Sequence, residues 1–215
     1  MKTPILQRYK NCFSDRSFIL SIIIAFTLLV AGMIANYYAG LYATRVASAA
    51  VTDLILDNIR VFNVKNLFFY GPVIFWIYAV SLCALHPGRA PFVFKSVALL
   101  IFVRCVFVSL THLGLSSEHI PIETTTVFGD FIGQAGLFFS GHTAFPFLMA
   151  LIYWNDFWHR WLFVAASLFF GIIVLLAHIH YSIDVLSAFF ITYAVFDLSK
   201  FVFKKDLSHF EATLL

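Results

Sequence analysis

Residues 17–43 read SFILSIIIAFTLLVAGMIANYYAGLYA, an apolar run without a charged side chain. A helix needs about 20 mostly apolar residues to cross the hydrocarbon core of a bilayer, and this run is longer than that. The small residues at 47–50 lie too far downstream to end a signal peptide, whose apolar core is about 7–15 residues long. We therefore predict an uncleaved membrane anchor, preceded by the basic residues Lys2, Arg8, Lys10 and Arg16.

The chain as a whole is strongly apolar. Of its 215 residues, 61% are hydrophobic and 12% are charged, and the mean hydropathy is +0.91. This composition is too apolar for a soluble domain of the same length. The formal net charge of +3 does not indicate a nucleic-acid partner, because basic residues in membrane proteins mainly set orientation.

Five further apolar runs follow the first, so we predict an all-α membrane protein with a bundle of six transmembrane helices. An even number of spans puts both tails on one side, and both tails are basic, which favours the cytoplasm. The domains are then a cytoplasmic tail (1–16), a membrane domain (17–203) and a second cytoplasmic tail (204–215). The later spans are expected at 67–85, 92–113, 138–154, 161–177 and 181–203.

This topology assigns the loops to two sides of the membrane. Arg89 and Arg160 lie in short cytoplasmic turns. Residues 51–64 have apolar side chains at helix-like spacing, which fits either an amphipathic helix at the outer interface or an ordinary loop. The charged residues of the non-cytoplasmic side are Asp53, Asp57, Glu118, Glu123, Asp130, Arg45, Arg60 and Lys65.

His180 and Asp184 are four residues apart at the expected outer start of the last span. On a helix this spacing places both side chains on one face, where the carboxylate can bind an imidazole nitrogen. That contact fixes the histidine tautomer and leaves the other nitrogen free to attack or to accept a proton. Ionisable residues inside membrane spans are costly and mark functional sites. We predict a catalytic pair; a histidine packed for structural reasons is the alternative.

His142 belongs to the tetrapeptide Ser140-Gly141-His142-Thr143, at the expected start of the fourth span. The first N–H groups of a helix lack internal acceptors and lie at the positive end of its dipole, which suits a phosphate. Gly141 would let the backbone approach such a group closely. We predict that His142 is catalytic and that Ser140, Gly141 and Thr143 bind phosphate. The alternative is that Ser140 only caps the helix.

Arg104 is expected in the outer half of the third span, at the depth of the two histidine motifs. Its guanidinium is a permanent cation whose donors match phosphate oxygens, so we predict a phosphate-binding role. Snorkelling to the interface is the alternative. His178 and Tyr181 flank His180 and either support the site or belong to the interfacial aromatic belt. The three cysteines, Cys12, Cys83 and Cys105, have no spacing that indicates a disulfide or a metal site.

The run LLAHIHYSIDV at 175–185, preceded by FSGHT at 139–143, closely resembles the sphingomyelin synthase family. That family belongs to the wider type-2 phosphatidic acid phosphatase superfamily. The resemblance covers about 104–196, and Arg104 with Thr111 is similar to the family's third-helix motif. The stretch DLILD at 53–57 also resembles the segment after the family's first helix.

The resemblance implies a six-helix fold of the phosphatase kind and a double displacement at histidine, with no metal and no cofactor. His180 would attack the phosphorus of a phospholipid, Asp184 would orient His180, and His142 would protonate the departing lipid oxygen. The expected partners are membrane lipids: a phospholipid donor and a lipid alcohol or water as acceptor. An oligomer is possible, but nothing in the sequence supports one.

Three functions remain open. The favoured one is transfer of a phospho-head group, such as phosphocholine or phosphoethanolamine, to ceramide or diacylglycerol. The second is hydrolysis by the same residues, as in a lipid phosphate phosphatase or a phospholipase C-like enzyme. The third is non-enzymatic lipid binding or transport. We expect the site on the non-cytoplasmic face, preferably facing the periplasm from a bacterial inner membrane, with an endomembrane lumen as the alternative.

Overall fold

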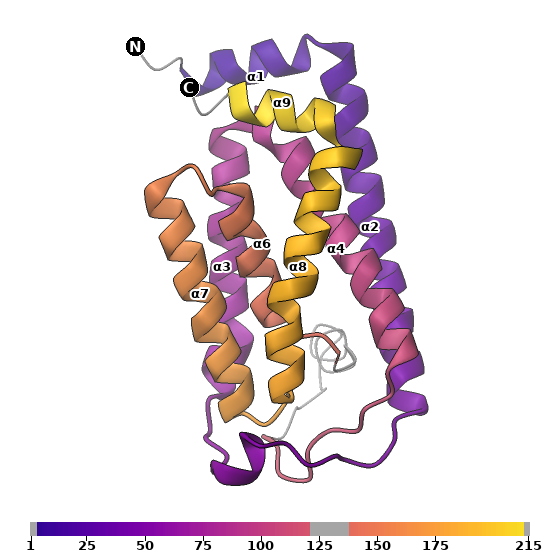
Figure 1. The fold of residues 1–215 in the computed structure, drawn as a ribbon. Helices are drawn as coiled ribbons and strands as arrows, with labels where there is room; N and C mark the ends of the chain where they lie inside the picture. Colours follow the sequence, from indigo (N-terminus) through magenta and orange to yellow (C-terminus); the bar gives the residue numbers. More distant parts are fainter. Residues whose placement is uncertain (1–3, 121–137, 213–215) are drawn as a thin grey trace.

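The computed structural model describes residues 4–120 and 138–212, and all regular secondary structure in this part of the chain is helical. The predicted loop residues Glu123 and Asp130 and the tail residue Lys2 lie outside the described residues. The helices run side by side and form an elongated bundle (Figure 1).

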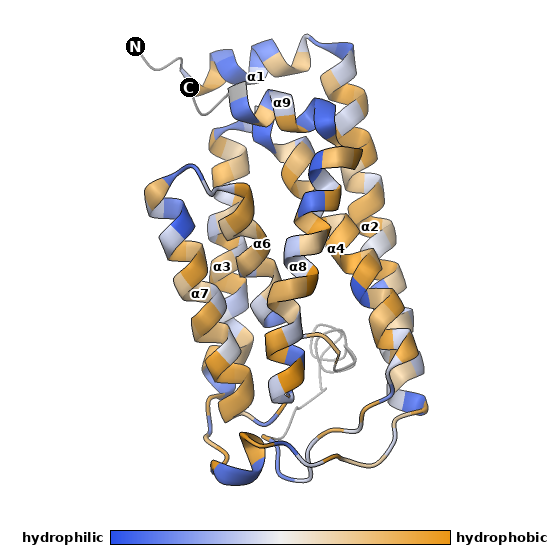
Figure 2. Cartoon of the chain, viewed as in Figure 1, coloured by the Kyte–Doolittle hydropathy of each residue, from blue (hydrophilic) through white to orange (hydrophobic). Residues whose placement is uncertain are grey.

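Within the described residues, five helices are long and apolar enough to cross a bilayer. The turn η2 (Pro87–Arg89) leads directly into the third of them, which extends that span to 87–110. Figure 2 shows these helices as mainly hydrophobic, with hydrophilic residues gathered towards the two ends of the bundle. The protein is therefore built as a multi-pass membrane protein. The five are α2 (Arg16–Arg45), α3 (Lys65–Leu85), α4 (Ala90–Leu110), α7 (Phe157–Leu176) and α8 (Ser182–Val202).

The predicted span at 138–154 is shorter than expected. Its helix, α6 (Gly141–Ile152), has 12 residues, about 18 Å at about 1.5 Å per residue, against a hydrocarbon core of about 30 Å. Ser140 has extended backbone angles, so the helix begins only at Gly141. Because Leu148, Met149 and Ala150 are fully buried, α6 is an interior element that packs against α7 and α8 (Figure 1).

Small side chains explain why α2 lies so close to α4. Ala25, Gly32 and Ala39 recur at seven-residue intervals on α2, and all three are buried. A Cβ atom on Gly32 would lie 3.3 Å from Cγ2 of Ile101 on α4. Close helix packing through small residues is typical of membrane proteins, in which hydrophobicity does not itself drive helices together.

The two tails contribute short helices at the same end of the bundle (Figure 1). The helix α1 (Ile5–Phe13) is joined to the end of α3 by a hydrogen bond of 3.0 Å from Arg8 to the carbonyl of Leu85. The helix α9 (Lys204–Ala212) is joined to α4 by an ion pair of 2.7 Å between Lys95 and Asp206. That this end faces the cytoplasm stays a prediction.

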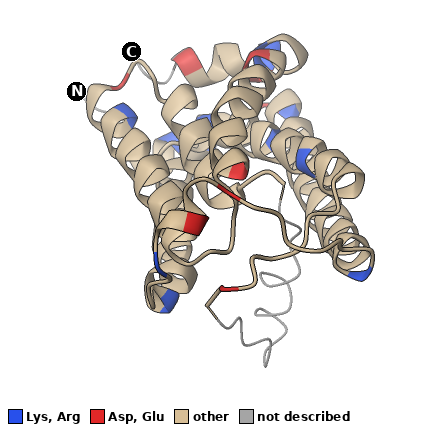
Figure 3. Ribbon diagram, turned by 60° about the horizontal axis from the view of Figure 1, so that its bottom comes forward, with Lys and Arg blue, Asp and Glu red and all other residues tan. Residues whose placement is uncertain are grey.

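Loops close the opposite end. Between α2 and α3 the only helical turn is η1 (Leu56–Asn58), so an ordinary loop, and not an amphipathic helix, occupies 51–64. Figure 3 brings this end forward and marks the acidic and basic positions along the ribbon. The loops and neighbouring helix ends at this end of the bundle carry the charged residues Asp53, Asp57, Glu118, Arg45, Arg60 and Lys65.

Candidate active site

His180 and Asp184 are in contact, as predicted, but by a different geometry. The helix α8 begins at Ser182, so His180 precedes it and the two residues do not share a helical face. Nδ1 of His180 lies 3.2 Å from Oδ2 of Asp184. The same oxygen accepts a hydrogen bond of 2.9 Å from the N–H of Tyr181. An acidic side chain in the third helical position commonly reaches back to the N-cap residue in this way.

The pair is withdrawn from solvent. Asp184 has no exposed surface and His180 is 5% exposed. Oδ1 of Asp184 is buried without a hydrogen-bond partner among the described residues. A carboxylate in the first turn of α8 also lies near the positive end of the helix dipole. Asp184 is thus placed to act on the imidazole of His180.

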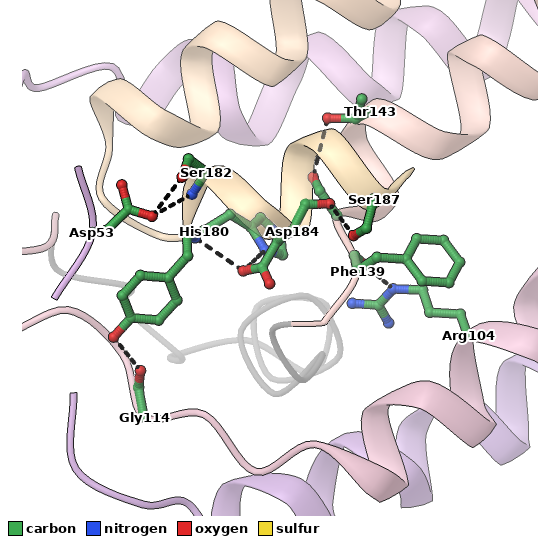
Figure 4. A network of polar contacts seen from close by, with 11 residues as sticks. Asp53, Arg104, Gly114, Phe139, Thr143, His180, Ser182, Asp184 and Ser187 are labelled. Atoms are coloured by element: carbon green, nitrogen blue, oxygen red, sulfur yellow. Dashed lines mark hydrogen bonds and ion pairs between the residues drawn. The ribbon is translucent and has the colours of Figure 1, made fainter. Parts of the chain in front are cut away.

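The two histidine motifs are joined through the backbone. The N–H of Ser140, which directly precedes α6, donates a hydrogen bond of 3.1 Å to the carbonyl of Asp184. Figure 4 shows the resulting network, which runs from Asp53 and Ser182 past Asp184 towards Phe139 and Arg104. Residues from four distant parts of the sequence therefore meet at one end of the bundle.

His142 lies in the first turn of α6. Its ring stacks on Phe68 of α3 at a centroid distance of 4.5 Å, and Phe170 of α7 approaches it edge-on at 6.4 Å. Nε2 of His142 is 3.4 Å from the carbonyl of Phe68, which is long for a hydrogen bond. Stacking, more than hydrogen bonding, therefore fixes the orientation of this imidazole.

Arg104 of α4 is buried at the same end, with 5% of its surface exposed. Its Nε donates to the carbonyl of Phe139 at 2.9 Å, and its Nη1 donates to Oδ1 of Asn36 at 2.8 Å. A Cβ atom on Gly141 would lie 3.6 Å from Nε of Arg104, so the glycine brings the start of α6 close to the guanidinium.

Asn36 is a site residue that the sequence analysis missed. It lies on α2, which is otherwise apolar in this region, and faces the same cavity as Arg104. The available signal was a single amide in the middle of a membrane span, where polar groups are costly.

These side chains line one cavity of about 970 Å³. Its polar end is formed by Asn36, Arg104, Gly141, His142 and His180. From there it follows α4 down to Phe94, a distance of about 15 Å at about 1.5 Å per residue. The walls of this long part are mostly apolar and include Met33, Pro72, Trp76, Val80, Val97 and Ile101.

Two of the predicted phosphate-binding residues, Ser140 and Thr143, lie away from the cavity wall. The side chains of Ser140 and Thr143 are fully buried and are not among the described residues that line the cavity. Oγ1 of Thr143 donates to Oγ of Ser140 at 3.3 Å, and Oγ of Ser167 donates to the carbonyl of Thr143 at 2.8 Å. The two hydroxyls thus bond to each other, and the bond from Ser167 joins α7 to the backbone of α6.

The residues that flank His180 support the turn between α7 and α8. His178 is 3% exposed and has a φ of 55°, a left-handed conformation in which histidine is enriched among non-glycine residues. Tyr181 is 2% exposed, and its hydroxyl donates to the carbonyl of Gly114 at 2.8 Å. Both residues thus shape the chain on either side of His180.

The fold and the site together define a multi-pass helical membrane protein with two histidines, an aspartate and an arginine around an apolar cavity. Among residues 4–120 and 138–212, no three His, Cys, Asp or Glu side chains gather as a metal site.

Residues 135–201 match the family model described as PAP2 superfamily C-terminal. The match supports the type-2 phosphatidic acid phosphatase superfamily and indicates phosphatase- or phosphotransferase-type chemistry on lipids. It includes His142, His180 and Asp184, whereas Asn36 and Arg104 precede it. No curated protein and no solved structure matches the chain.

Proposed function

We propose that this protein is a lipid phosphotransferase that moves a phospho-head group from a glycerophospholipid to a lipid alcohol such as ceramide or diacylglycerol. The observation that carries the proposal is the His180–Asp184 contact of 3.2 Å at the wall of an apolar cavity that His142 and Arg104 also line. The site faces the non-cytoplasmic side of the membrane in this proposal, preferably the bacterial periplasm.

In the first step, Nε2 of His180 attacks the phosphorus of the donor while its Nδ1–H donates to Asp184. The bond between phosphorus and the diacylglycerol oxygen breaks, and protonated His142 transfers a proton to that oxygen. The products are diacylglycerol and a phosphohistidine that carries the head group. Acid catalysis by a positioned side chain contributes about a hundred- to ten-thousand-fold.

In the second step, the hydroxyl of the acceptor lipid attacks the same phosphorus. His142, now neutral, takes the hydroxyl proton, and the bond between phosphorus and Nε2 breaks. His142 is then protonated and His180 is free, so both residues return to their starting forms. Arg104 and the first N–H groups of α6 stabilise the charge on the phosphoryl oxygens, an effect worth about a hundred- to thousand-fold for each well-placed donor.

The cavity supports a lipid substrate. Ligand pockets commonly have volumes of about 300–1,000 Å³, so one of about 970 Å³ is at the large end of the range. A lipid with its phosphate beside Arg104 would extend its chain along the apolar walls between α2, α3 and α4.

The resemblance to sphingomyelin synthases supports transfer. Broader phosphatases of the superfamily have an arginine upstream of their second histidine, where this chain has Val174. Sphingomyelin synthases usually have Cys-Gly-Asp before Ser-Gly-His-Thr, where this chain has Gln134-Ala135-Gly136, outside the described residues. The proposal therefore names the reaction and leaves the head group open among phosphocholine, phosphoethanolamine and related groups.

Hydrolysis is the second candidate, and the superfamily match favours it because that superfamily includes phosphatases. Water would then resolve the same phosphohistidine. Release of phosphate or of the phospho-head group without a lipid alcohol, at a rate that the alcohol does not reduce, would identify a hydrolase. Non-enzymatic transport is less favoured; it would be supported if His180→Ala kept full function.

Mass spectrometry of lipid products tests the proposal. Purified protein in vesicles is given a labelled phospholipid together with ceramide or diacylglycerol. We expect a new lipid that carries the labelled head group with wild type and none with His180→Ala. Absence of such a product with every acceptor would contradict transfer.

A further inference from the structure

The start of α8 is held by a carboxylate from a distant loop. Oδ2 of Asp53 accepts hydrogen bonds from the N–H of Ser182 at 2.8 Å and from its hydroxyl at 2.7 Å (Figure 4). Asp53 is 8% exposed. The N-cap residue of α8, Tyr181, provides an aromatic side chain where helices usually have Ser, Thr, Asp or Asn. Asp184 binds the N–H of Tyr181 from within the helix, and Asp53 supplies from the loop an acceptor for the next N–H, that of Ser182.

The loop presents this carboxylate in a fixed orientation. Oδ1 of Asp53 accepts from the N–H groups of Ile55 at 2.9 Å and Leu56 at 3.1 Å, and the N–H of Asp53 donates to Oδ2 of Asp57 at 3.0 Å. One oxygen of Asp53 thus organises its own turn while the other binds α8. Hydrogen bonds to charged groups are stronger than those between neutral groups, and the oxygen that faces α8 accepts two.

The same loop is attached on both sides of His180. Ahead of the histidine, the N–H of Phe62 donates to the carbonyl of Leu176 at 2.9 Å. After it, the N–H of Val51 donates to the hydroxyl of Tyr181 at 3.2 Å. Because these contacts enclose residues 176–182, a shift of the loop would move the backbone that carries His180.

We propose that Asp53 is a positioning residue, which holds the first turn of α8 so that Asp184 meets Nδ1 of His180. This rests on the proposed function, because it assigns Asp53 to the same reaction. Asp184 follows Ser182 by two residues in the same helical turn. The hydrogen bonds from Ser182 to Asp53 and the contact between Asp184 and His180 therefore involve one rigid turn of α8. The His180–Asp184 distance of 3.2 Å is at the long end for a hydrogen bond, and a small displacement of that turn would break it.

Amide hydrogen exchange tests the cap without reference to activity. Asp53→Asn keeps the shape of the side chain and removes its charge. We expect faster exchange at Ser182, Ile183 and Asp184 in this variant than in wild type, with α2 and α4 unchanged. Glu118→Gln is the control, since it removes one carboxylate at the same end, but from an exposed position. Equal exchange in Asp53→Asn and Glu118→Gln would overturn the proposal, whether or not the protein acts on lipids.

Turnover tests the link to the catalytic pair. We expect Asp53→Asn to lower kcat by about ten- to a hundredfold, because small misplacements of reacting groups have effects of that size, with KM changed by less than a factor of about two. In an Asp184→Asn background the same substitution should have little further effect, since the contact it protects is already lost. Ser182→Ala, which removes one of the two donors, should give an intermediate kcat.

A merely structural role for Asp53 gives a different pattern. The effects of Asp53→Asn and Asp184→Asn on kcat would then multiply, and that result would overturn the proposal. If the wild-type protein lacks lipid activity while Asp53→Asn exchanges faster at the start of α8, the proposed function is refuted. The conclusion that Asp53 caps α8 is then still supported.

Discussion

At the scale of single residues, the reactivity of His180 depends on what its two nitrogens meet. Nδ1 faces the fully buried Asp184, while the histidine also lines the cavity. A buried carboxylate of this kind selects the tautomer with a proton on Nδ1 and stabilises the imidazolium. The same carboxylate oxygen binds the backbone of Tyr181, so the acceptor cannot rotate away from the histidine.

Asp184→Asn should lower kcat by about a hundred- to ten-thousand-fold, the range of acid–base contributions. The amide oxygen of the new side chain can still accept the hydrogen bond from Tyr181. The side chain no longer carries the negative charge that fixes the tautomer of His180. The measurement is steady-state transfer in vesicles, with the unfolding midpoint as the check on folding. A kcat within twofold of wild type would contradict the role of Asp184.

Asn36→Leu should reduce kcat/KM about tenfold, equivalent to about 1.4 kcal/mol. The substitution removes the acceptor of the 2.8 Å bond from Nη1 of Arg104, so the guanidinium loses a contact that orients it in the cavity. Ser81→Ala is the control, because Ser81 also lines the cavity but bonds locally to the carbonyl of Tyr78. Equal effects of the two substitutions would show that Asn36 does not act through Arg104.

At the scale of helices and loops, the site is formed where several elements begin or end. Both α6 and α8 start there, and the backbone bond from Ser140 to Asp184 ties the two starts together. Helix starts present unpaired N–H groups, which is why a carboxylate such as Asp53 can bind one of them and why the proposed reaction assigns a phosphate to others. The connection from α2 to α3 is thus part of the site's framework.

The Asp53 cap predicts an acid limit for stability. Burial raises the pKa of this carboxyl, but hydrogen bonds from Ser182, Leu56 and Ile55 outweigh burial and leave the pKa below its ordinary value. The stabilisation is therefore complete above about pH 4, the ordinary value for aspartate, and is lost as the pH falls through the folded-state pKa. Unfolding midpoints of wild type and Asp53→Asn should differ at neutral pH and converge in acid. A difference that stays constant down to pH 3 would contradict the cap.

At the scale of the whole molecule, an ion pair closes the end opposite the site. Lys95 of α4 bonds Asp206 of α9 at 2.7 Å and Ser21 of α2 at 2.7 Å, and Ser21 also donates to Asp206. All three helices are fixed by this buried cluster. It lies far along α4 from Arg104, so its role is in the stability of the bundle.

Lys95→Met should destabilise the protein by about 3–5 kcal/mol, because it leaves Asp206 buried without its charge partner. The double variant Lys95→Met/Asp206→Leu should recover most of that loss, since apolar replacement of a buried pair is often neutral or favourable. Unfolding midpoints in detergent measure both effects, and kcat of the folded protein should stay unchanged. A double variant less stable than the single one would show that the pair itself stabilises the bundle.

The sequence predicted the long spans well, because length and hydropathy alone decide them. It overestimated the fourth span, because residues 138–154 contain no Asp, Glu, Lys or Arg, whereas the helix covers only Gly141–Ile152. It predicted the His180–Asp184 contact from spacing, although α8 begins two residues after His180. The sequence did not indicate that Asn36 and Asp53 belong to the site. Their partners Arg104 and Ser182 lie 68 and 129 residues away in the sequence, and only the fold brings them together.

The central claim is that His180 carries the phospho-head group between the two steps. The direct measurement is peptide mapping by mass spectrometry after brief reaction with labelled donor, without acceptor and quenched in base, in which phosphohistidine survives. We predict the head group on Nε2 of His180, its loss when acceptor lipid is added, and its absence from His180→Ala. Product formation with no modified His180, or with the label on another residue, would contradict the account.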